Sequence, residues 1–113
     1  MKKLKIVLLF ISTLFIVSCE SNTYQEVSEV VINPTYVKDI APVCNAECVA
    51  CHSAGGQYPE LDTYAAVKDA VTNGNFLCRI NASCGSVMPP SGAMPQATID
   101  VIKLWSTNGY LNN

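Results

Sequence analysis

The chain has 113 residues, enough for one domain, with nine acidic and seven basic side chains. Three of the seven basic residues lie within the first five positions, so removal of an N-terminal signal would leave a formal charge of −5. That charge argues against nucleic acid and against an anionic membrane surface as partners.

The first 18 residues have the pattern of an export signal. Three lysines precede an uncharged apolar run of 13 residues, 6–18, whereas a membrane-spanning helix needs about 20. The segment Ile16-Val17-Ser18-Cys19 resembles a bacterial lipobox, with Ile where Leu is usual. The resemblance implies a signal peptide over 1–18 and acylation of Cys19, which would anchor the chain in a lipid bilayer. An ordinary cleaved signal with an unmodified Cys19 is the alternative.

Residues 19–34 are polar with scattered valines and no sustained periodicity. We expect them to form a lipidated tether for a single domain over 35–113. A domain of this size has a small core, so a cofactor or a covalent staple is expected. The chain has six cysteines, and export would place them in an oxidising compartment.

Two short helices are predicted in the first half of the domain. Apolar residues at helical spacing indicate one over 36–43, which we expect Pro42 to limit. A second opens after Asp62 or Thr63, either of which can serve as its N-cap. The sequence 73–75, Asn-Gly-Asn, is expected to end it.

The second half combines a long irregular segment with the clearest helix of the chain. Residues 76–97 show no period and contain two cysteines and two methionines, which favours a functional loop. A helix then begins near Gln96 or Thr98 and ends at Gly109. Its apolar stripe consists of Ile99, Val101, Ile102, Leu104 and Trp105. With no alternating strand pattern anywhere, the predicted class is all-α, with about three short helices joined by long loops.

The segment Cys48-Val49-Ala50-Cys51-His52 has the pattern of a haem c attachment site. Two intervening residues let both sulfurs reach one edge of a porphyrin from a single turn, and the next residue projects its imidazole under the iron. The pattern predicts one covalent haem c, held by thioethers from Cys48 and Cys51. His52 is then the proximal axial ligand of the iron.

Three other uses of these residues compete with haem attachment. A thioredoxin-like redox pair needs a βαβ setting, and no strand is evident. A disulfide between the two motif cysteines would leave His52 without a role. A zinc site could draw on Cys44, Cys48, Cys51 and His52 with Cys78 or Cys84. The rival function is therefore a non-redox interaction lipoprotein stabilised by zinc or disulfides.

Elimination leaves two candidates for the distal ligand of the iron. His52 is the only histidine, so a second imidazole from this chain is excluded. Once the signal is removed, Met88 and Met94 are the only thioethers, and local sequence does not separate them. A thioether favours ferrous iron, and an iron with both axial positions filled suits electron transfer better than catalysis or sensing.

Beyond the motif, three segments carry a family resemblance: 35–40, Met88-Pro89-Pro90, and Ile102-Lys103-Leu104-Trp105. With them the chain resembles the small single-haem, class I-like cytochrome c domains of bacterial lipoproteins, common in the Bacteroidetes group. The resemblance implies a small cytochrome c-like fold with Met88 as the distal ligand, and a closing helix with Trp105 and Gly109.

The same resemblance implies an electron carrier rather than an enzyme. Its partners would be redox proteins, or oxidoreductases that are fused to such domains or encoded beside them. It would sit in the cell envelope, lipid-anchored on the periplasmic or outer side of a bacterial membrane.

Three cysteines depart from the family pattern. Cys78 and Cys84 are close enough in sequence for a short disulfide that would restrict the methionine loop. Pairing of Cys44 with either of them is the alternative, and one thiol is left over in each case.

Overall fold

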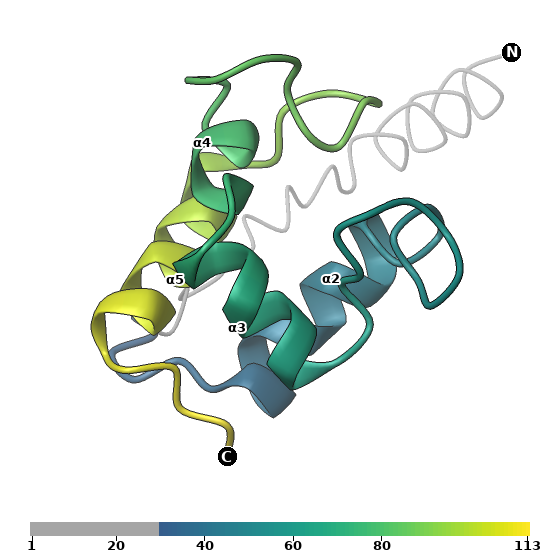
Figure 1. The fold of residues 1–113 in the computed structure, drawn as a ribbon. Coiled ribbons are helices and arrows are strands. Elements are labelled where there is room, and N and C mark those ends of the chain that lie inside the picture. Colours follow the sequence, from purple (N-terminus) through teal and green to yellow (C-terminus); the bar gives the residue numbers. More distant parts are fainter. Residues whose placement is uncertain (1–29) are drawn as a thin grey trace, which may run out of the picture.

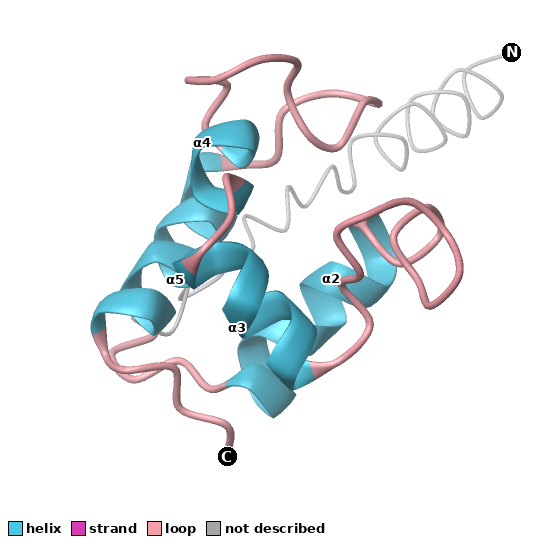
Figure 2. Ribbon diagram, viewed as in Figure 1, coloured by secondary structure: helices cyan, strands magenta, loops and turns pink. Residues whose placement is uncertain are grey.

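The computed structural model describes residues 30–113, so the expected signal peptide, the lipobox with Cys19 and most of the tether lie outside the described residues. From residue 30 onward the chain is helical and contains no strand, which confirms the all-α class (Figures 1 and 2). The elements are the π-helical turn η1 (Tyr36–Ile40) and the α-helices α2 (Ala41–Glu47), α3 (Tyr64–Thr72), α4 (Phe76–Ile80) and α5 (Gln96–Thr107). None of these helices is both long and apolar enough to cross a bilayer.

The first helical segment is longer than predicted. It opens at Thr35, whose hydroxyl accepts from the Lys38 N–H, and the wide turn η1 follows. Pro42 lies in the first turn of α2, where a helix needs no intrahelical N–H donor. The helix therefore continues through Cys44 to Glu47, and the expected end at residue 43 is wrong.

Helix α3 confirms the predicted boundaries, whereas α4 was not predicted. The Thr63 hydroxyl accepts from the Ala66 N–H at 3.2 Å, so Thr63 is the N-cap of α3, and Asn73 ends the helix. Helix α4 has five residues, too few for an apolar period to be recognised in the sequence.

Helix α5 ends in a Schellman motif. Gly109 has φ +87°, the Gly109 N–H donates to the Ser106 carbonyl, and the Tyr110 N–H donates to the Trp105 carbonyl at 3.0 Å. The rings of Tyr110 and Trp105 meet edge to face with centroids 5.0 Å apart. The closing turn therefore carries the chain back over α5, as the predicted glycine cap requires.

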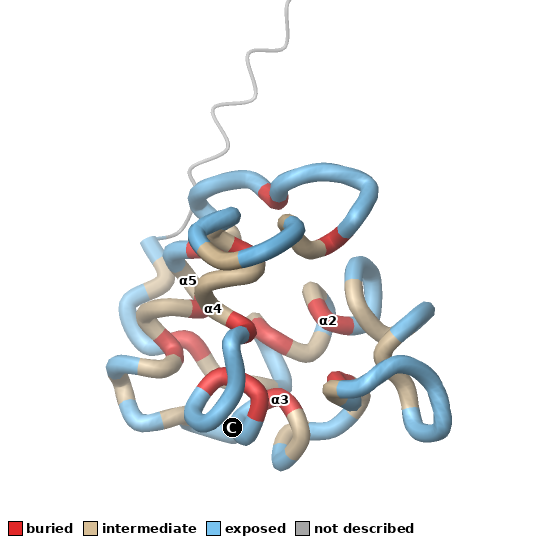
Figure 3. Tube along the Cα trace, turned by 45° about the horizontal axis from the view of Figure 1, so that its top comes forward, coloured by how far each residue is buried: buried red, intermediate tan, exposed pale blue. Residues whose placement is uncertain are grey.

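The core gathers around Trp105, whose side chain is fully buried and whose indole N–H donates to the Leu111 carbonyl at 2.8 Å. Tyr36 from η1 and Tyr64 from α3 pack against it. The buried stretches come from every helix (Figure 3). The core also contains Ile40, Cys44, Leu61, Val67, Ala70, Val71, Phe76, Ile80, Met94, Ile99 and Ile102.

The packed domain starts slightly before residue 35. Pro34 is fully buried, and the side-chain amide of Asn108 donates to the Ile32 carbonyl at 3.1 Å. The beginning of the described chain is thus fastened to the end of α5.

Candidate functional site

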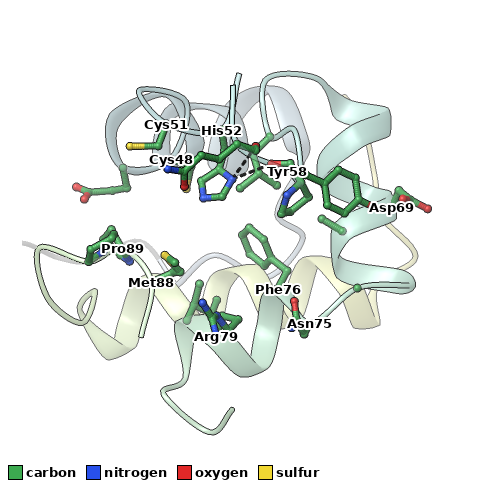
Figure 4. Close-up of a pocket in the computed structure, with 18 of the residues that line it drawn as sticks. Cys48, Cys51, His52, Tyr58, Asp69, Asn75, Phe76, Arg79, Met88 and Pro89 are labelled. Carbon is green, nitrogen blue, oxygen red and sulfur yellow. Dashed lines mark hydrogen bonds between the residues drawn. The ribbon is translucent and has the colours of Figure 1, made fainter. Parts of the chain in front are cut away.

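A cavity of about 640 Å³ lies between the loop after α2 on one side and α3, α4 and the loop before α5 on the other (Figure 4). This volume falls within the range of small-molecule and cofactor sites. Much of its wall is apolar, formed by Pro59, Leu61, Ala70, Phe76, Ile80, Pro89, Pro90 and Met94. Every residue that the sequence predicts for the haem site lines this cavity: Cys48, Cys51, His52, Met88 and the alternative ligand Met94.

One wall of the cavity is the turn at the C-terminal end of α2. The N–H groups of Cys48 and Val49 both donate to the Cys44 carbonyl at 2.9 Å, where the helix ends. The Cys48 carbonyl then accepts from the N–H groups of both Cys51 and His52, at 3.1 and 2.9 Å. Because one carbonyl closes both bonds, Cys48, Cys51 and His52 come from a single compact turn and line the same cavity.

The imidazole of His52 is oriented by backbone oxygens. Its Nδ1 lies 2.8 Å from the Pro59 carbonyl and 3.2 Å from the Gln57 carbonyl (Figure 4). A carbonyl oxygen only accepts, so Nδ1 carries the proton and Nε2 carries the lone pair. A backbone carbonyl on Nδ1 is the usual partner of a histidine that binds a metal through Nε2.

The loop that supplies those carbonyls is folded tightly back onto the motif. The Gln57 N–H donates to the Cys51 carbonyl at 2.8 Å, and the Leu61 N–H donates to the His52 carbonyl. A Cβ on Gly56 would lie 2.6 Å from the Cys51 carbonyl oxygen, so only glycine fits this approach. The Asp62 carboxylate holds the loop from the other side by accepting from the Ala54 N–H.

Met88 and Met94 both line the cavity. Met88 lies on the wall opposite His52 and is partly exposed (Figure 4). The Met88 N–H donates to the Arg79 carbonyl at 3.1 Å, which ties the methionine loop to α4. Met94 is 7% exposed and belongs to the core. Met88 is thus the methionine labelled opposite His52 in Figure 4, and Met94 packs in the core while also lining the cavity.

Cys78 and Cys84 form a disulfide at the start of the methionine loop. The Cys78 carbonyl accepts from the Ser83 N–H at 2.8 Å within the ring that the disulfide closes. This ring begins on α4, next to Arg79, whose side chain packs over Gly85. Arg79 is the one Lys or Arg side chain among the residues that line the cavity, which also include Glu47 and Asp69.

Cys44 is a buried free thiol on the core side of the motif. A hydrogen bond to Cys48 raises the pKa of the Cys44 thiol, and burial raises it further. The same hydrogen bond lowers the pKa of Cys48, against an opposing effect of burial. Cys44 is thus held protonated beneath the first motif cysteine.

The donor set does not converge as a zinc site would. Within residues 30–113, no three side chains of His, Cys, Asp or Glu come together closely enough to hold a metal ion. Two of the cysteines that such a site could have used are joined to each other instead.

Two contributors to the site were not anticipated from the sequence. The carbonyls of Gln57 and Pro59 orient His52, yet a main-chain oxygen has no sequence signal of its own. The one available hint was the Gly55-Gly56 pair, which marks a tight turn beside the motif.

Comparison with known proteins adds no relative: no family model matches the chain, and neither a curated protein nor a solved structure does. Inferences about function therefore depend on the residues of the cavity.

Proposed function

We propose that this chain is a small c-type cytochrome of class I-like fold that carries electrons while tethered to a bacterial membrane through acylated Cys19. The observation that supports this most directly is one cavity lined by the motif turn on one wall and by Met88 on the other. The oriented Nε2 of His52 is the second support.

The residues present fit the requirements of haem c. Cys48 and Cys51 would hold it through thioethers, and His52 and Met88 would supply the axial nitrogen and sulfur. Apolar walls suit a porphyrin face, and Arg79 supplies a cation for a carboxylate substituent. When bound, haem c supplies one-electron chemistry at its iron. With His52 and Met88 both bound to the iron, the haem would have no open coordination site for a substrate.

A pyridine haemochrome spectrum tests this proposal on protein produced in a host with haem c maturation machinery. We expect the absorption band of a doubly thioether-linked haem, and a Cys48→Ser variant should shift it to the position for a single linkage. Protein from the same host without haem would refute the proposal. Zinc in that protein, found by metal analysis, would favour the interaction lipoprotein instead.

A further inference from the structure

Four of the five large apolar side chains that are strongly exposed lie near the two ends of the described chain. Val30, Ile32, Val37 and Leu111 are 84, 72, 58 and 41% exposed. The fifth, Tyr58, lines the cavity. Single exposed apolar residues are ordinary, but a group of them on one surface marks a site of interaction.

The two ends are held together by hydrogen bonds. The N–H groups of Tyr36 and Val37 donate to the carbonyls of Leu111 and Asn112, at 2.8 and 3.1 Å. The Asn108 amide reaches the Ile32 carbonyl. Residues 30–37 and 107–113 therefore form one surface, called the terminal face below.

The terminal face has no charged side chain of its own. Its 15 residues include no Asp, Glu, Lys or Arg, and the polar ones are amides and hydroxyls. Of the two charged residues that follow directly, Asp39 has its carboxylate engaged by the Thr35 N–H at 2.7 Å. An acidic protein thus presents apolar side chains and amides along these two segments, with the Lys68 ammonium 5.4 Å from the centre of the Tyr110 ring. Apolar side chains, amides and a neighbouring lysine are a composition suited to the headgroup region of a bilayer.

We propose that the terminal face is a lipid-contacting surface that rests on the bilayer holding acylated Cys19, so that the domain lies against the membrane. The inference depends on the proposed lipid anchor. Ten residues, 20–29, separate Cys19 from Val30, and ten residues span at most about 35 Å. The anchor therefore keeps the face at high effective concentration near lipid, where even weak apolar contact is populated.

This contact leaves the cavity accessible. None of the four exposed apolar residues of the terminal face lines the cavity. In Figure 1 the C-terminus lies at the lower end of the molecule, whereas α4 and the loops beside it lie at the upper end. A domain resting on its terminal face would turn the cavity toward the aqueous side, where soluble redox partners approach.

Hydrogen–deuterium exchange of the acylated protein in phosphatidylcholine nanodiscs, one copy per disc, tests the proposal. The reference is an unanchored Cys19→Ser protein. We expect several-fold slower exchange at 30–37 and 107–113 in the anchored protein, and equal exchange at 51–60. Replacing Ile32 and Leu111 together by Asn should remove the difference in exchange, because the apolar contact with lipid is lost. The variant should still fold, since both side chains are exposed and lie outside the core. Ile32→Leu combined with Leu111→Ile, the matched control that keeps both side chains apolar, should retain it.

Equal exchange of anchored and unanchored protein at the terminal face would overturn the proposal. So would protection that appears only with two copies per disc, since the face would then join copies of the chain. An intact mass without acyl chains would refute the anchor and this inference together, while leaving the haem proposal to its own spectrum.

Discussion

Nδ1 of His52 donates to the carbonyl oxygen of Pro59 at 2.8 Å, which leaves Nε2 as the free nitrogen of the only imidazole in the chain. The bond joins the motif turn to the far end of the loop that follows it. The orientation of the proposed axial ligand is therefore fixed by the path of the loop rather than by the motif itself.

Gly56 is the residue on which that path depends most. An alanine there would place its Cβ 2.6 Å from the Cys51 carbonyl oxygen, and neither backbone segment can move away easily. We expect Gly56→Ala to lower the free energy of unfolding by about 2 kcal/mol or more. The neighbouring Gly55 has φ +77° and open space around it, so Gly55→Ala should cost only about 1 kcal/mol. Urea denaturation of both variants measures the difference, and equal losses would contradict the role of Gly56.

Replacement of each methionine separates a ligand from a packing residue. Met88→Ala should abolish the weak sulfur-to-iron charge-transfer band and lower the reduction potential, within the roughly 0.8 V that axial ligands span. Met94→Ala should keep the band but lower the free energy of unfolding by about 2–5 kcal/mol, because Met94 is 7% exposed in the core. Absorption spectra and denaturation curves of the two variants provide the check. If the band survived in Met88→Ala, Met94 would be the iron ligand and Met88 would not.

These two methionines show how much of the candidate site could be predicted from the sequence. The motif could be interpreted at once because its chemistry lies within five consecutive residues. Local sequence left Met88 and Met94 open, and the family resemblance implied Met88. In the fold both methionines line the cavity, and Met88 lies on the wall opposite His52. Pro42 misled because proline is compatible with both the end of a helix and its first turn, and the backbone of η1 decides which.

Loss of the disulfide should loosen the methionine loop. Cys78 and Cys84 are six positions apart, and the chain-entropy relation assigns about 2 kcal/mol to a ring this short. We expect a Cys78→Ser and Cys84→Ser double variant to unfold at lower urea concentration by that amount. On heating, the double variant should also lose the charge-transfer band at a lower temperature than the wild type does, because the disulfide ring begins beside the Arg79 carbonyl that anchors Met88. A thiol reductant also reduces the iron, so only the urea midpoints are compared in its presence, and those of the wild type and the double variant should then coincide.

Arg79 should tune the reduction potential. A cation at the cavity wall disfavours ferric iron, so its removal should lower the potential. At about 10 Å and an effective dielectric of about 20, a unit charge is worth roughly 1.7 kcal/mol, or about 70 mV for one electron. Potentiometric titration of Arg79→Gln should show a decrease of this order. Lys38→Gln removes an exposed charge that does not line the cavity and should leave the potential unchanged.

Cys44 should make the free energy of unfolding depend on pH in the alkaline range. The thiol has an ordinary pKa of 9.0, which its hydrogen bond to Cys48 and its burial raise in the folded protein. Below pH 9 the thiol is protonated in both states and does not change stability with pH. Above pH 9 the unfolded chain releases the proton while the folded one keeps it, so the free energy of unfolding falls by about 1.4 kcal/mol per pH unit. Anaerobic urea denaturation between pH 8 and 10 should show this slope in the wild type. A Cys44→Ala variant should be flatter above pH 9, and parallel curves would show that Cys44 titrates as it does in the unfolded chain.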